Sequence, residues 1–98
     1  MIDLSSKELE QVKRILLPGI AKGVSVWVFG SRINGEATDT SDLDLVIKGK
    51  EKIPLNVYYA LKDAFEYSDL PFRIDLLDWH RLGEEFQKLI LQNYEPLI

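Results

Sequence analysis

The sequence contains no cysteine, so neither a disulfide framework nor a thiolate metal site is available to it. It also lacks a run of about 18 apolar residues, the length that a membrane-spanning helix needs. The first residues, MIDLSSKELEQ, do not show the charged-then-apolar layout of a signal peptide. These absences exclude a disulfide-stabilised secreted domain and a membrane-spanning protein, and we expect a cytoplasmic location.

Basic residues are too few for a protein that holds a nucleic acid polymer by its phosphates. The chain has 12 Lys and Arg against 16 Asp and Glu, a net charge of −4, whereas such binding needs a basic face. No Walker A pattern is present, which excludes P-loop ATPases and kinases. An acidic enzyme can still bind a nucleoside triphosphate when a metal ion supplies the positive charge.

The chain length and the hydrophobic pattern predict one small α/β domain over residues 1–98. A chain of 98 residues with 46% hydrophobic content buries roughly two thirds of its unfolded surface. Apolar spacing, β-branched runs and capping residues predict alternating helices and strands. We expect helices over 5–17 and 54–68 and another after Asp78 as its N-cap, and strands over 24–29, 42–48 and 72–77.

The lengths of the connections predict a mixed sheet of three core strands. The segment 30–41 is too short for a parallel crossover, so the first two strands should be antiparallel. The segment 49–71 holds a helix, so the second and third strands should be parallel. We expect the helices to cover one face of this sheet and the other face to be open.

Carboxylates on the expected open face are the unusual feature of the sequence. Asp42 and Asp44 occupy alternate positions of a strand, so their side chains share one face about 7 Å apart. Asp75 falls on the same face of the third strand. Such a cluster destabilises a fold unless a cation lies between the carboxylates. Asp oxygens suit a hard ion, and the pattern therefore predicts a Mg²⁺ site.

The segment from Gly30 to Ile47 resembles the signature of the nucleotidyltransferase superfamily that includes the DNA polymerase β catalytic core. Gly30 and Ser31 are followed by ten residues and then by Asp42-x-Asp44. The fuller pattern, with Arg32 and Gly35, is similar to that of the minimal nucleotidyltransferases (MNT). The resemblance implies the nucleotidyltransferase fold and a transferase that moves AMP from ATP to a hydroxyl group.

The resemblance also implies catalytic and metal-binding roles. Asp42, Asp44 and Asp75 would bind two Mg²⁺ ions, and Asp75 would activate the attacking hydroxyl. Asp75 is matched by its place in a strand and not by a fixed spacing. From the residues alone, Asp42 could instead cap a turn, and Asp44 could be a solubilising residue of an edge strand.

The nucleotide-binding residues implied by the resemblance are Gly30, Ser31 and Arg32. Gly30 and Ser31 would hold triphosphate oxygens, and Arg32 is a candidate phosphate ligand. Taken singly, Gly30 could be a turn glycine and Arg32 a surface charge. Arg73 shares a face with Asp75, and we expect a salt bridge to the carboxylate cluster more than a substrate contact.

Many MNT proteins are antitoxins encoded beside a HEPN-domain ribonuclease toxin. The resemblance therefore implies such a toxin as partner and acceptor, modified on a tyrosine, with oligomers formed through the toxin. The alternatives are a non-catalytic antitoxin that neutralises its partner by contact, and nucleotidyl transfer to a small molecule. A template-independent polymerase fragment is a further alternative, which the acidic charge disfavours.

Overall fold

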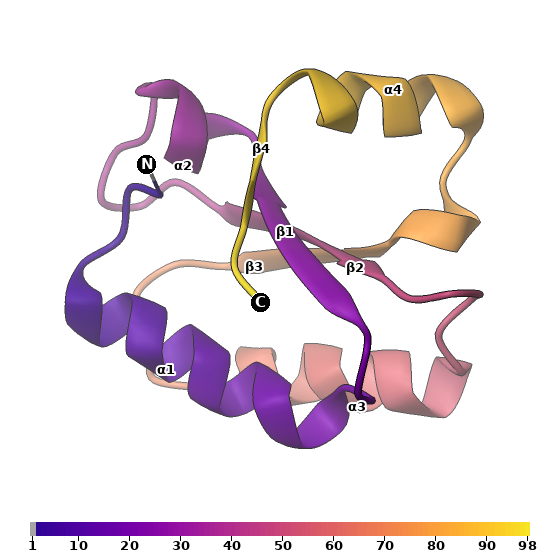
Figure 1. Ribbon diagram of the computed structural model, residues 1–98. Coiled ribbons are helices and arrows are strands. Elements are labelled where there is room, and N and C mark those ends of the chain that lie inside the picture. The colour runs from indigo at the N-terminus through magenta and orange to yellow at the C-terminus, as the bar shows by residue number, and fades with distance from the viewer. Residues whose placement is uncertain (1) are drawn as a thin grey trace.

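The computed structural model describes residues 2–98, which form four α-helices and four strands in an alternating order (Figure 1). No helix in this part of the chain is both long and apolar enough to span a membrane. The elements are α1 (Ser6–Leu16), η1 (Leu17–Gly19), β1 (Ser25–Phe29), α2 (Ser31–Asn34), β2 (Leu43–Lys48), α3 (Leu55–Glu66), β3 (Ile74–Asp78), η2 (Trp79–Arg81), α4 (Glu84–Gln92) and β4 (Tyr94–Pro96).

The four strands form one mixed sheet in the order β3-β2-β1-β4. β1 and β2 are antiparallel, and β2 and β3 are parallel. Both pairings confirm the topology predicted from the connection lengths. β4, which pairs antiparallel with β1, was not predicted, because three residues ending in proline carry too weak a strand pattern.

The main core lies between one face of the sheet and the helices α1 and α3, which run together below the sheet in Figure 1. Leu43, Leu45 and Ile47 of β2 point into this core and are fully buried. The start of α1 has the predicted capping box: Glu8 N–H donates to Ser5 Oγ, and Ser5 N–H donates to Glu8 Oε1. The helix face and its first residue thus follow the sequence pattern closely.

The opposite face of the sheet carries a second apolar cluster and a helix of its own. Val46 packs there with Trp79 and Ile90, and α4 lies on the other side of the sheet from α1 and α3 (Figure 1). The prediction that helices pack on one face only is therefore wrong. The chain enters α4 from β3 through η2 and not through a crossover connection. The apolar stripe of α4 could therefore pack on either face of the sheet, and the sequence pattern does not indicate which one.

Asp78 is also placed differently from the prediction. Its carboxylate is buried and accepts hydrogen bonds from Ile53 N–H (2.8 Å) and His80 N–H (3.1 Å), and it pairs with Arg81 Nε at 3.2 Å. It therefore caps the short turn η2, and the N-cap of α4 is Gly83.

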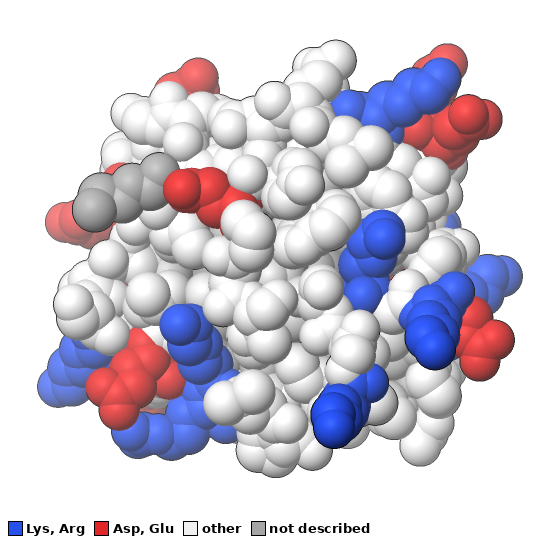
Figure 2. Space-filling model, in the orientation of Figure 1, with Lys and Arg blue, Asp and Glu red and all other residues white. Residues whose placement is uncertain are grey.

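Charges of both signs lie around the margin of the face that Figure 2 shows, and its centre is mostly uncharged. No continuous basic surface appears on that face, in keeping with the net charge of −4. This face does not provide the extended basic stripe with which proteins hold nucleic acid polymers.

Candidate active site

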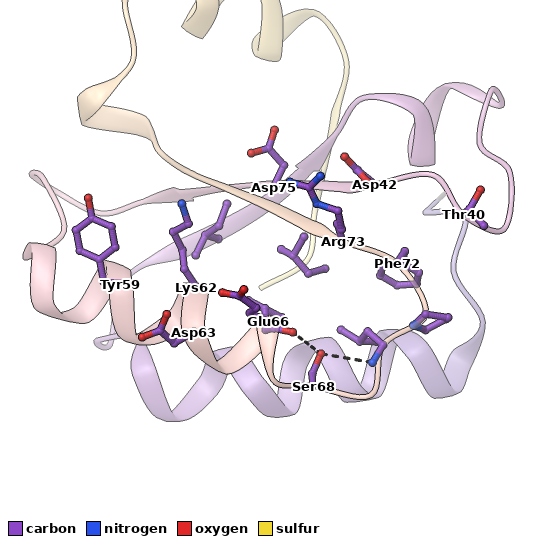
Figure 3. Close-up of a pocket in the computed structure, with 15 residues that line it drawn as sticks. Thr40, Asp42, Tyr59, Lys62, Asp63, Glu66, Ser68, Phe72, Arg73 and Asp75 are labelled. Atoms are coloured by element: carbon purple, nitrogen blue, oxygen red, sulfur yellow. Dashed lines mark hydrogen bonds between the residues drawn. The ribbon is translucent and has the colours of Figure 1, made fainter.

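The sheet register places two of the predicted carboxylates side by side. Asp44 of β2 and Asp75 of β3 are paired residues in the parallel ladder, and neighbouring strands lie roughly 4.8 Å apart. Paired residues project to the same face, which here is the one opposite α1 and α3. Asp42 precedes Asp44 by two positions, and Figure 3 shows Asp42 and Asp75 pointing to the same side of the sheet.

The carboxylates interact strongly enough to change an ionisation equilibrium. Burial, followed by the negative charges of Asp75 and Asp42, raises the pKa of Asp44 from its ordinary 3.8 to about 6. Among the ion pairs between described residues, none joins these carboxylates to Lys or Arg. The salt bridge predicted for Arg73 is therefore absent: its side chain is exposed beside Asp75 and Asp42 without a paired carboxylate.

Gly30 lies directly against this cluster. Its φ of +80° is in the left-handed region that glycine favours. A Cβ atom at this position would also collide with Asp44 Oδ2, so a side chain here would strain the backbone and displace the carboxylate. The Gly30–Ser31 backbone therefore passes beside the carboxylates at a distance that favours glycine.

The residues after Gly30 form one helical turn, α2, which the sequence analysis did not predict. Gly35 ends this helix with φ +82°. A glycine in the left-handed conformation is a common helix terminator. Because the helix has only four residues, its apolar periodicity is too short to detect in the sequence.

Arg32 is not placed as a phosphate ligand. The side chain is only 4% exposed. Its Nε and Nη2 groups donate to Ser41 O at 3.2 and 2.8 Å, Nη2 also to Asp39 O at 3.3 Å, and Nη1 to Asp3 O at 3.0 Å. The guanidinium stacks on the Phe72 ring at 4.5 Å. These contacts make Arg32 a buried residue that holds the loop before Asp42, and they do not support the predicted phosphate contact.

An aromatic pair borders the cluster on the α4 side. Phe29 is paired with Asp44 in the β1–β2 register, so both side chains are on one face. Phe86 of α4 meets the Phe29 ring edge-on, with 6.1 Å between centroids, and remains 41% exposed. The local sequence pattern does not indicate that Phe86 is exposed beside the cluster.

A groove of about 1050 Å³ opens on the other side of the carboxylates, between α3 and β3 (Figure 3). Asp42 and Asp75 stand at its rim, and Arg73 lies between them in the view of Figure 3. From α3, Tyr59, Lys62, Asp63 and Glu66 line it. The Tyr59 side chain is exposed toward this groove.

The carboxylates fit a magnesium ion that is completed by its substrate. In residues 2–98, no group of three or more His, Cys, Asp or Glu side chains converges closely enough to enclose a metal ion by itself. Mg²⁺ typically takes one or two carboxylates and fills its other positions with water and substrate phosphates. The cluster of Asp42, Asp44 and Asp75, which no described Lys or Arg neutralises, is a donor set of that kind.

Comparison with known proteins places this arrangement among nucleotidyltransferases. The family described as "Polymerase beta, Nucleotidyltransferase" matches residues 10–98. The chain is 44% identical over 93 residues to a probable protein adenylyltransferase MntA of Haemophilus influenzae, which covers 95% of this chain and 81% of that protein.

Three solved structures are similar in fold. A crystal structure of a toxin–antitoxin with AMP-PNP has a TM-score of 0.73 at 19% identity and covers 97% of this chain and 73% of that chain. A mutant MntA–HpeT toxin–antitoxin has a TM-score of 0.71 at 14% identity, with 92% and 71% covered. The spectinomycin adenyltransferase AAD(9) of Enterococcus faecialis, with ATP and spectinomycin, has a TM-score of 0.59 at 20% identity, with 95% and 47% covered.

Proposed function

The chain belongs to the polymerase β-type nucleotidyltransferase family, and from this premise we propose that it transfers AMP from ATP to a hydroxyl group of a partner protein. The observation that carries the proposal is the unpaired carboxylate cluster at Asp44, with Gly30 packed against it where no side chain fits. A relative at 44% identity that is named as a probable protein adenylyltransferase supports the choice of AMP and of a protein acceptor.

In this proposal the Gly30–Ser31 backbone and the Ser31 hydroxyl hold oxygens of the triphosphate. Asp42, Asp44 and Asp75 would supply the protein ligands of Mg²⁺, two ions in the full site, with water and the triphosphate completing the coordination. When bound, magnesium neutralises the phosphates and stabilises the charge that develops during transfer. Burial and then repulsion by Asp75 and Asp42 raise the pKa of Asp44, and the cations would remove the repulsive part.

The acceptor side of the reaction falls to Asp75. Its exposed carboxylate accepts the proton of the acceptor hydroxyl, and the freed oxygen attacks the α-phosphorus of ATP. The bond between the α-phosphorus and the bridging oxygen breaks, and pyrophosphate leaves. Asp44, on the neighbouring strand and half-buried, is better placed to hold a cation than to exchange protons with solvent.

We infer further that the partner is a HEPN-domain toxin encoded beside this chain, modified on tyrosine, and that the chain acts as its antitoxin in the cytoplasm, where ATP is supplied. Similarity to toxin–antitoxin structures supports this assignment. Two other activities remain to be separated by experiment. One is neutralisation of the partner by contact alone. The other is transfer to a small molecule, and the similarity in fold to a spectinomycin adenyltransferase is the reason to test it.

The test uses the purified chain, Mg²⁺, ATP labelled in the α-phosphate and the purified HEPN partner. We expect the label to become covalently attached to the partner, and mass spectrometry to find AMP on a tyrosine. Asp44→Asn should abolish labelling while the melting temperature is maintained or raised. Asp69→Asn, which removes the same charge from an exposed loop, should label like wild type.

Two results would contradict the proposal. If Asp44→Asn labels the partner as efficiently as the wild-type chain does, the carboxylate cluster does not take part in the reaction. Inhibition of the toxin without any labelling by the wild-type chain would instead identify an antitoxin that acts by contact alone.

A further inference from the structure

Two aromatic rings form a corner beside the carboxylates, on the side of α4. Phe29 directly precedes Gly30 and is paired with Asp44 across the β1–β2 ladder, so it lies where the phosphate-binding backbone meets the carboxylate cluster. Phe86 meets the Phe29 ring with 6.1 Å between centroids and an interplanar angle of 86°. Rings at nearly a right angle give the corner two apolar walls, and one of these walls adjoins the proposed magnesium ligands.

The corner is held in place by the packing beneath it. Phe29 packs against the second apolar cluster, which contains Val46, Trp79 and Ile90. Ile90 is 2% exposed and lies one helical turn after Phe86, on the same side of α4. The burial of Ile90 therefore holds α4 against the sheet with Phe86 in contact with Phe29. Phe86 itself remains 41% exposed, so part of its ring is accessible to a ligand.

ATP bound at the carboxylates brings a planar ring close to this corner. In the proposed site the triphosphate lies between the Gly30–Ser31 backbone and the magnesium ions, and only the ribose separates the α-phosphate from adenine. Adenine is neutral and flat, so the surface that binds it must be apolar and must lie one sugar away from the cluster. An aromatic side chain provides such a surface, because a base stacks on its face.

The other exposed aromatic ring near the carboxylates is less well placed for the base. Tyr59 is 55% exposed and lines the groove between α3 and β3. In Figure 3 it stands toward the opposite end of that groove from Asp42. Phe29, in contrast, is the direct neighbour of Asp44 on the adjacent strand. The position of the cluster therefore favours the aromatic corner over the groove.

We propose that the adenine ring of ATP stacks on the exposed face of Phe86, with Phe29 as the second wall of the corner. The inference rests on the proposed adenylyl transfer and adds to it the residue that binds the base. Phe86 holds one end of the nucleotide and the Gly30–Ser31 backbone the other, which fixes the α-phosphate at the carboxylates. Every base has a π-face, so this stacking contributes affinity without selecting adenine over guanine.

The test compares ATP with inorganic tripolyphosphate, which has the chain of three phosphates but no base. Titration calorimetry in Mg²⁺ gives Kd for each ligand with wild type, Phe86→Ala and Phe86→Trp. We expect Phe86→Ala to raise Kd for ATP about tenfold, as loss of one base-stacking ring does. Its Kd for tripolyphosphate should stay within about twofold of wild type, a change of about 0.4 kcal/mol. Phe86→Trp should bind ATP at least as tightly as wild type, because it keeps an aromatic face.

The matched control is Tyr59→Ala, which removes another exposed ring from the groove side of the cluster and should leave both Kd values unchanged. The inference is overturned if Phe86→Ala binds ATP like wild type, or if it weakens tripolyphosphate binding as much as ATP binding. A rise in Kd for ATP with Tyr59→Ala alone would also overturn it, because the base would then lie in the groove.

A failure of the proposed function gives a different result. If the wild-type chain binds neither ligand, both the nucleotide site and the base-stacking role of Phe86 are refuted. If ATP binding depends on Phe86 and no AMP reaches a protein acceptor, the proposed function fails while the inference holds.

Discussion

Replacing Asp44 by Asn should stabilise the metal-free protein at neutral pH and leave its stability unchanged in acid. Burial and the charges of Asp75 and Asp42 raise the pKa of Asp44 from 3.8 to about 6. The folded protein therefore binds more protons than the unfolded chain between these values, and its free energy of unfolding falls as the pH rises through this window. Below pH 3.8 the carboxyl is neutral in both states, and the repulsion is absent.

The size of the effect follows from the difference between the two pKa values, which corresponds to about 3 kcal/mol at 1.36 kcal/mol per pKa unit. Asp44 is only half-buried, and solvent screening reduces this to about 1–2 kcal/mol. For a domain of this size, such a gain raises the melting temperature by roughly 4–16 °C.

Urea denaturation in EDTA at pH 4 and pH 7, for wild type and Asp44→Asn, measures this contribution directly. We expect the variant to be more stable at pH 7 and nearly equal at pH 4, because at pH 4 the folded protein keeps Asp44 protonated. Asp69→Asn should show no such pH-dependent gain. A loss of stability at pH 7 would mean that Asp44 is a structural hydrogen-bonding residue, and an equal gain at both pH values would mean that its charge does not cause the effect.

Three further substitutions test the surroundings of the cluster. Gly30→Ala and Gly35→Ala should each lower the free energy of unfolding by about 1–2 kcal/mol, because both residues have positive φ. Only Gly30→Ala should also abolish AMP transfer, since its Cβ meets Asp44 while nothing lies within 4 Å at Gly35; equal activity of the two variants would refute this reasoning. Arg32→Lys should lower stability by about 1–3 kcal/mol, because the carbonyls of Asp3 and Ser41 lose donors. KM for ATP should stay near the wild-type value at a temperature where the variant is folded. A large rise in KM for ATP would instead support the predicted contact between Arg32 and phosphate.

The carboxylate cluster could be predicted from the sequence because it depends only on the alternation of side chains along a strand and on the lengths of the connections between strands. Asp42 and Asp44 share a face since side chains alternate along a strand. The helix between β2 and β3 predicted parallel pairing, and the hydrophobic residues that flank Asp75 fixed its face. The observed pairing of Asp44 with Asp75 follows from these local rules.

Features that depend on contacts distant in the sequence could not be predicted. The side of the sheet on which α4 lies depends on how η2 redirects the chain after β3, and no local pattern encodes that direction. The groove beside Asp75 depends on the spacing between α3 and β3, and Tyr59 and Phe86 are exposed because no other described element covers them. Helical periodicity indicates which side chains share a face, but not whether another element covers that face.

The structure gives Arg32, a residue of the family motif, a different role from the phosphate binding that its charge suggests. Its guanidinium joins the Asp3 carbonyl, 29 positions away in the sequence, to the Ser41 carbonyl directly before Asp42. Within the same loop, Thr38 N–H donates to Ser41 Oγ at 2.8 Å, so the ten residues between Ser31 and Asp42 form a constrained connection. A fork of fixed donors suits this task, and a lysine ammonium would not satisfy carbonyls in several directions at once. The arginine that follows Gly30-Ser31 therefore contributes to the site by holding Asp42 in register with Asp44 and Asp75, and the charge available beside the carboxylates is that of Arg73.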